Sequence, residues 1–137
     1  MSSINFGHHA PNCILTIDSS GFSDGRLQWR GVSVKANTGA FQGQTGDYIT
    51  IGQLEQLSTE LESLYQSLKG KIEFGTLEDR FVMELIGDGM GHILLKFRLY
   101  DEIARLEFFS GELDQTFLPE LINEVKETIA EYFEENK

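Results

Sequence analysis

Four strand-like segments follow one another closely between residues 71 and 110, and this succession constrains the fold more than any other feature of the chain. They run over Lys71 to Thr76, Arg80 to Ile86, His92 to Tyr100 and Arg105 to Ser110. Only short turn-forming stretches separate them, and short connections join antiparallel neighbours. In the third segment, HILLKFRLY, apolar residues recur at every second position, which indicates one buried and one wetter face. The stretch therefore predicts an antiparallel meander.

Three further strands are expected upstream, and they are less regular. Their ranges are Cys13 to Asp18, Leu27 to Ala36 and the glycine-interrupted Phe41 to Ile51, with a turn-rich segment from Ser19 to Gly25 after the first. In the second of these strands the apolar residues do not share one parity. We therefore expect Arg30 and Gly31 to form a bulge that resets the buried face.

Two amphipathic helices complete the predicted elements. From about Gly52 to Lys69, leucines recur at steps of three and four, with Gly70 placed to cap the C-terminus. The second helix is expected to begin near Asp114 or Thr116, either of which can cap free amides, with Pro119 tolerated in the first turn. Both apolar stripes need a surface to cover.

These elements predict an α+β fold in which an antiparallel β-sheet of about six strands carries the two amphipathic helices on one face. The 137 residues suit one domain over residues 1–137. Residues 1–11 are expected to form a flexible N-terminal arm. Residues 134–137 are expected to fray, because acidic side chains at a helix C-terminus oppose the helix dipole.

The chain is strongly acidic, with 22 Asp and Glu against 11 Lys and Arg. Nucleic-acid binding depends on basic side chains that neutralise phosphates, so a nucleic-acid partner is not expected. A basic protein partner suits this charge better, although acidic residues also keep domains soluble. No apolar run is long enough to cross a bilayer, and the chain begins without a signal-peptide pattern. With Cys13 as the single cysteine, these features predict a cytoplasmic protein.

No cofactor, metal site or catalytic group is expected. The chain has no P-loop, no GxGxxG after a strand, no GxSxG and no HExxH motif. His8 and His9 precede Cys13, but neighbouring histidines on an extended segment point in opposite directions, so we do not expect a zinc site there. His92 has no catalytic partner that the spacing would identify. The chain is therefore not expected to be an enzyme.

A family resemblance sharpens the functional expectation. The segment GDGMGHILLKFRL, followed by LEFFSGELDQTFLPELI, is similar to the WapI-type immunity proteins of bacteria, over about Ile14 to Ile129. Its most specific pieces are Gly91 to Ile93 and Asp114 to Pro119. The resemblance implies a small cytoplasmic protein, encoded beside a polymorphic toxin, that protects the cell by binding the toxin's C-terminal nuclease domain.

Two functions of different classes follow. In the first, a non-enzymatic inhibitor lays its acidic face over a basic toxin domain and thereby masks it. The candidate partner-binding residues lie on the last helix and are Glu120, Glu124, Glu127 and Glu131. In the second, a small-ligand or catalytic domain has a pocket between sheet and helices near His92, used with Asp88 or Asp114. The sequence does not determine the oligomeric state.

Overall fold

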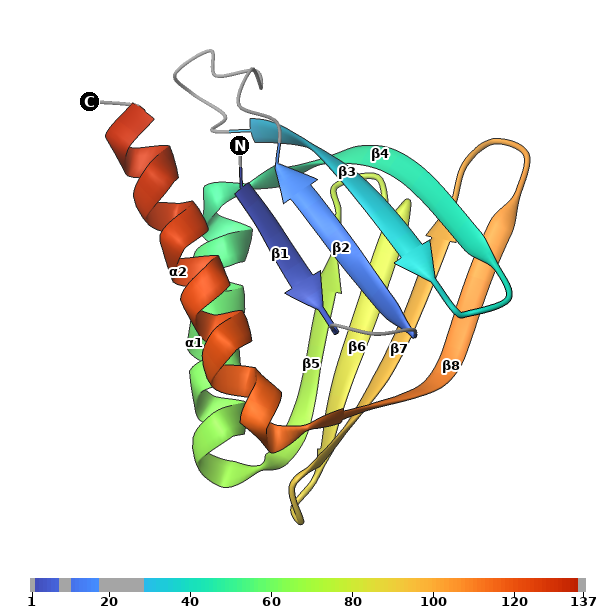
Figure 1. Ribbon diagram of the computed structural model, residues 1–137. Coiled ribbons are helices and arrows are strands. Elements are labelled where there is room, and N and C mark those ends of the chain that lie inside the picture. Colours follow the sequence, from blue (N-terminus) through green and yellow to red (C-terminus); the bar gives the residue numbers. More distant parts are fainter. Residues whose placement is uncertain (1, 8–10, 18–28, 136–137) are drawn as a thin grey trace.

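A computed structural model describes residues 2–7, 11–17 and 29–135, and within them two antiparallel sheets face each other while two helices close one side (Figure 1). The first sheet contains β1 (Ser2–Phe6), β2 (Asn12–Ile17), β3 (Trp29–Asn37) and β4 (Gln42–Thr50). The second contains β5 (Lys69–Gly75), β6 (Phe81–Asp88), β7 (His92–Tyr100) and β8 (Arg105–Asp114). Helix α1 (Ile51–Ser67) joins the sheets, and α2 (Leu118–Glu135) ends the fold.

Each sheet is a simple meander with its strands in sequence order. The predicted meander of the second half of the chain is confirmed, and so is the α+β class. The prediction of one sheet of about six strands is wrong, because the described residues form two sheets of four strands each. The physical reason is α1, which leaves the end of β4 and carries the chain to the opposite layer before β5 begins.

The core lies between the two inner sheet faces and beneath the helices, as one continuous cluster of buried side chains. On β7 the inward residues are Ile93, Leu95, Phe97 and Leu99, as their alternation predicted. Phe81 of β6 contacts the rings of Phe6 in the first sheet and Phe74 in the second, at 6.5 Å between centroids in both cases. The sheets are therefore packed on each other directly.

The sequence suggested that the helices cover one face of a sheet, but they do not. Helix α2 lies along β1 and α1 lies along β5, and the two helices pack against each other (Figure 1). Since β1 and β5 are edge strands of their sheets, the helices cover two edges that would otherwise expose unpaired backbone groups. The sheets supply the cover for each other's inner faces.

The N-terminal segment differs from the expected flexible arm. Residues 2–6 form β1, which pairs with β2 from Ser2 opposite Ile17 to Phe6 opposite Cys13. Ile4 and Phe6 are fully buried, and burying two large apolar side chains offsets the entropy lost by ordering a terminal strand. Residues 8–10 lie outside the described part of the chain.

The expected bulge at Arg30 and Gly31 is absent, because β3 pairs with β4 without a register shift. Arg30 points inward and lies 5.0 Å above the ring of Tyr132 on α2, so a cation–π contact accommodates a charged residue on the buried face. A bulge does occur between β7 and β8, where two residues of β8 face Lys96. Residues 18–28, which include the predicted turn from Ser19 to Gly25, lie outside the described residues.

The helix ends are close to the predicted positions. Thr50 and Gln53 form a reciprocal capping box that begins α1. The left-handed C-cap is Leu68, with φ of 58°, and not Gly70, because the chain enters β5 at Lys69 without an intervening loop. Asp114 caps the short 3-10 turn Gln115–Phe117, and Pro119 lies in the first turn of α2 as expected. Helix α2 continues to Glu135, so the described helix includes the first part of the predicted frayed tail.

Candidate protein-binding site

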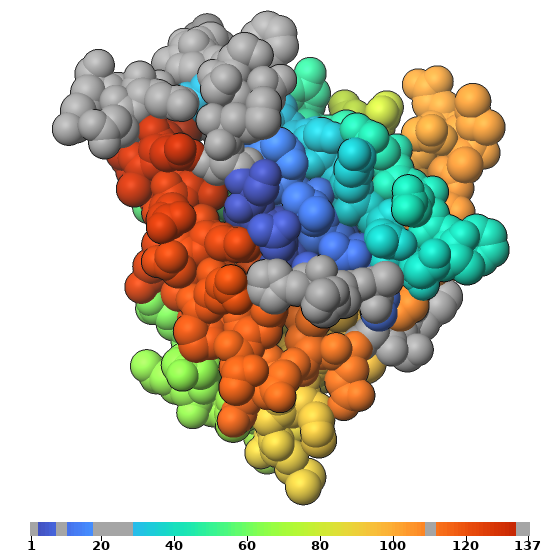
Figure 2. Space-filling view, in the orientation of Figure 1, coloured from blue at the N-terminus to red at the C-terminus, as the bar shows by residue number. Residues whose placement is uncertain are grey.

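Helices α1 and α2 pack against each other and together form what we call the helix layer. They contain nine glutamates and a single lysine, so they carry −8 of the net charge of −11 in two neighbouring elements. The apolar stripes of both helices face the core, and the exposed glutamates among the described side chains are Glu55, Glu120, Glu127 and Glu131. Figure 2 shows α2 in red along one side of the body. Negative charge is therefore concentrated on one side of the fold.

The four glutamates predicted to bind a partner are not equivalent. Glu120, Glu127 and Glu131 are exposed on α2. Glu124 is half-buried, and its two carboxylate oxygens accept hydrogen bonds from the backbone N–H of Asn5 at 2.8 Å and from the Asn5 side-chain amide at 2.9 Å. Glu124 therefore joins α2 to β1, which is a structural role.

An ion pair joins the two helices within this layer. Lys126 of α2 contacts the carboxylate of Glu62 on α1, and both side chains are about half-exposed. The pair orients the single lysine of the layer toward α1 and away from the outer row of glutamates. Exposed ion pairs add little stability, so its main consequence is local neutralisation of one glutamate.

His92 lies at the start of β7, on the outer side of the second sheet. Its Nδ1 is 3.0 Å from Oδ2 of Asp88, and Oδ1 of Asp88 accepts the backbone N–H groups of Met90 and His92. Asp114 pairs with His92 across the strands, but its carboxylate accepts the N–H of Thr116. These contacts give Asp88 and Asp114 roles in ordering a hairpin and a helix start.

We expect the pair of His92 and Asp88 to make a pH-dependent contribution to the stability of the fold. Asp88 raises the pKa of His92, first through their hydrogen bond and then through charge, with Glu112 and Asp114 adding to the effect. A raised folded-state pKa stabilises the fold below the pKa of the unfolded chain, and this stabilisation is lost as pH rises through the folded-state value. Asp88→Asn should therefore return the His92 pKa toward its ordinary value, which NMR titration measures. An unchanged His92 titration would contradict the pairing.

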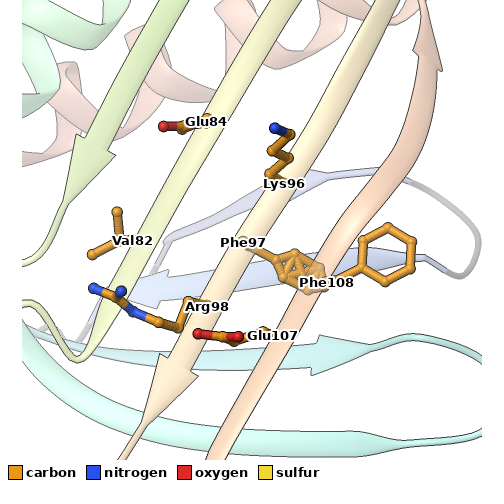
Figure 3. Close-up of a pocket in the computed structure, with 7 residues that line it drawn as sticks. All are labelled: Val82, Glu84, Lys96, Phe97, Arg98, Glu107 and Phe108. Carbon is orange, nitrogen blue, oxygen red and sulfur yellow. The ribbon is translucent and has the colours of Figure 1, made fainter.

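A shallow groove of about 250 Å³ lies on the outer face of the second sheet beside the bulge (Figure 3). Seven residues line it, two acidic, two basic and three apolar: Glu84, Glu107, Lys96, Arg98, Val82, Phe97 and Phe108. Nε of Arg98 is buried and has no hydrogen-bond partner among the described residues. The sequence signal for this site was the outward parity of Lys96 and Arg98, but the bulge that opens it could not be predicted.

The location of this groove differs from the predicted ligand pocket. The prediction placed a pocket between sheet and helices near His92, whereas the groove lies on the face of the second sheet that is turned away from the first sheet, and His92 does not line it. Opposite charges balance within the groove, since Glu84 faces Lys96 and Arg98 faces Glu107 across neighbouring strands. The arrangement could hold a small charged group but contains no nucleophile with an adjacent base.

Metal binding receives no support from the part of the chain that is described. No cluster of three or more His, Cys, Asp or Glu side chains able to hold a metal ion occurs there. Cys13 is fully buried, and burial raises the pKa of its thiol, which disfavours the thiolate that a metal ligand requires. His8 and His9 lie outside the described residues. Among the described helices, none has the length and apolar character needed to span a bilayer.

Fold and charge thus define a small α+β protein with two packed helices that carry most of its net negative charge. The sequence profile of the Immunity protein WapI-like family matches residues 8–132, nearly the whole chain, and the chain belongs to that family. The resemblance found in the sequence is therefore confirmed, and family membership indicates a toxin-neutralising immunity role. No curated protein and no solved structure matches the chain significantly.

Proposed function

We propose that this chain is a non-enzymatic immunity protein that binds a cognate toxin domain in the cytoplasm and masks its basic surface with the helix layer. The observation that carries the proposal is the net charge of −8 on α1 and α2 in a member of an immunity family. A toxin that is a nuclease needs a basic surface to hold phosphates. An acidic face competes for that surface directly.

The charge of the helix layer mainly affects the rate at which the two proteins associate, and has less effect on how slowly the complex dissociates. Opposite potentials speed the encounter of two proteins and make the rate fall as salt is added. Glu120, Glu127 and Glu131 are the exposed members of the predicted binding row, so they contribute to this steering. Glu124 contributes charge but is held by Asn5, which makes it a poor direct contact for a partner.

The experiment that tests the proposal is a binding measurement with the toxin domain encoded beside this chain's gene, in a catalytically inactive form. Changing Glu120, Glu127 and Glu131 together to Lys should raise the Kd at low salt by about 100-fold or more, because three attractive contacts become repulsive. The dependence of Kd on salt should flatten as well. Surface plasmon resonance at several salt concentrations measures both quantities.

A matched control separates surface position from net charge. Glu73, Glu107 and Glu112 are exposed on the outer face of the second sheet, and changing them together to Lys alters the net charge by the same amount. This control should change the Kd only a few-fold. Equal losses for the two triple variants would show that net charge, and not the helix layer, is responsible. Glu124 is left unchanged because its replacement would also break the contact with β1.

The same measurement discriminates the ligand-binding alternative. A domain that acts through the groove beside Arg98 would retain no toxin domain at any salt concentration. Charge reversal on α2 would leave ligand binding in the groove unchanged, because no residue of α2 lines the groove. Stable, salt-sensitive retention of the toxin domain favours the immunity role.

A further inference from the structure

Four exposed apolar side chains gather at one end of the molecule, away from the core. They are Trp29, Tyr48, Leu77 and Ile103, with exposed fractions of 37%, 37%, 42% and 95%. Four acidic residues lie in the same two turns, namely Glu78 and Asp79 after β5 and Asp101 and Glu102 after β7. We call these eight residues the turn surface. Large apolar groups held in water on neighbouring segments often mark a binding site.

The parts of the turn surface are adjacent in space. The backbone N–H of Leu77 donates to the carbonyl of Tyr48 at 2.9 Å, and the rings of Trp29 and Tyr48 are 6.4 Å apart between centroids. The two turns are joined because the N–H of Tyr100 donates to the carbonyl of Arg80 at 2.9 Å. The hydroxyl of Tyr100 also donates to the carbonyl of Glu78 at 3.1 Å. The two turns are therefore adjacent, and Arg80 contacts Glu78 in one turn at 3.5 Å and Glu102 in the other at 4.0 Å.

The turn after β5 is held rigidly by a buried carboxylate. Asp47 of β4 accepts hydrogen bonds from the hydroxyl of Thr76 at 2.5 Å, from the N–H of Glu78 at 3.2 Å and from the N–H of Arg80 at 3.1 Å. These bonds fix the backbone on both sides of Leu77. An exposed apolar residue on a fixed turn binds a partner without losing much conformational entropy.

The turn after β7 is fixed in the same manner by its own first residue. Oδ1 of Asp101 accepts the N–H of Ile103 at 2.8 Å and of Ala104 at 2.7 Å, while the N–H of Asp101 donates to the carbonyl of Ala104. The backbone bonds lower the pKa of Asp101, so its carboxylate stays charged and able to cap the turn. Figure 2 shows this orange turn projecting from the body. Ile103 is thereby presented in water at the tip of an ordered turn.

We propose that the turn surface is the anchoring part of the toxin interface, with Ile103 and Leu77 inserted into an apolar depression on a basic face of the toxin domain. The inference rests on the proposed function, because it assumes that the toxin domain is the partner. Although Arg80 contacts Glu78 and Glu102, the four carboxylates around the apolar groups leave a surface that is still net acidic and fits a face rich in Lys and Arg. The helix layer then governs the rate of association, and the turn surface governs the rate of dissociation.

The two surfaces have different roles because different parts of a protein interface determine the association rate and the dissociation rate. A few buried apolar or aromatic anchors account for most of the binding energy, whereas charges at the periphery mainly change the association rate. The helix layer exposes a row of glutamates, while the turn surface offers large apolar groups on ordered backbone. Each surface thus supplies what the other lacks.

The test is the double variant Ile103→Ser and Leu77→Ser, measured against the inactive toxin domain encoded beside this gene. We expect the Kd to rise by about 30-fold or more, mainly through faster dissociation, with the salt dependence of association unchanged. Met90→Ser is the control, because Met90 is also strongly exposed but lies at the tip of the β6–β7 hairpin, at the other end of β7. It should bind as the unaltered chain does.

The possible results separate this inference from the function on which it rests. If the unaltered chain binds the toxin domain and the double variant binds equally well, the turn surface is not the anchor, while the immunity role stands. If the unaltered chain binds no toxin domain, both proposals are overturned. Unfolding curves for the double variant verify that a weaker complex is not caused by a less stable fold, since both substituted side chains are exposed.

Discussion

Phe81→Ala should lower the free energy of unfolding by about 4 kcal/mol, the largest effect we expect from one substitution. Phe81 is fully buried at the start of β6 and contacts Phe6 and Phe74. Phe6 belongs to the first sheet, so removing the Phe81 ring leaves a cavity where the two sheets meet. Denaturant unfolding followed by far-UV circular dichroism measures the loss.

The matched control makes the same chemical change at an exposed site. Phe41 is strongly exposed just before β4, and Phe41→Ala should change the free energy of unfolding by less than about 0.5 kcal/mol. Phe81→Leu should cost less than Phe81→Ala, since part of the cavity remains filled. A loss below about 1 kcal/mol for Phe81→Ala would contradict the described packing between the sheets.

Asp47→Ala should lower the free energy of unfolding by about 3 kcal/mol. Asp47 is buried at 5% exposure and accepts several hydrogen bonds from the turn between β5 and β6. Its removal leaves the N–H groups of Glu78 and Arg80 without their acceptor, and bonds to a charged acceptor are stronger than neutral ones. Thermal and denaturant unfolding both report the loss.

A double-mutant cycle with Thr76→Val tests whether Asp47 acts through this turn. The hydroxyl of Thr76 is buried and donates to Asp47, so the two substitutions together should cost less than their separate effects combined. Glu55→Ala, which removes an exposed carboxylate from α1, should be close to neutral. Additive losses for Asp47 and Thr76 would indicate that the two side chains do not interact.

Strand alternation made the second sheet predictable from the sequence. On β7 every second residue is apolar and buried, and the turns between β5, β6, β7 and β8 carry residues typical of tight connections. The first sheet was harder to predict because β4 buries Thr45 and Asp47, whose polarity hides the inward face. β1 was missed because five residues at a chain terminus give too short a pattern.

The relation between the sheets could not be predicted from local patterns. Two helices with apolar stripes were expected to cover one sheet, yet each sheet covers the other and the helices cover edge strands. Arg30 was misread for a related reason: its buried position depends on the ring of Tyr132, about a hundred residues away along the chain. Contacts between distant segments decide both features.

The candidate site was partly predictable. Helical periodicity correctly placed Glu120, Glu127 and Glu131 on the outside of α2, but it could not show that Glu124 binds Asn5, a residue 119 positions away. For the turn surface a signal existed, because Ile103 follows two acidic residues in a short connection where an apolar residue has no folding role. That its turn lies beside the turn of Leu77 required the three-dimensional structure.

The most direct test of the immunity role is a titration of toxin activity with the purified chain. The active form of the toxin domain that the proposal takes as the partner is mixed with increasing amounts of the protein, and the remaining toxin activity is measured at low and at high salt. We predict complete inhibition near one molecule of this chain per toxin domain at low salt, and weaker inhibition as salt increases. Undiminished toxin activity in a large excess of the chain at low salt would contradict the proposed function.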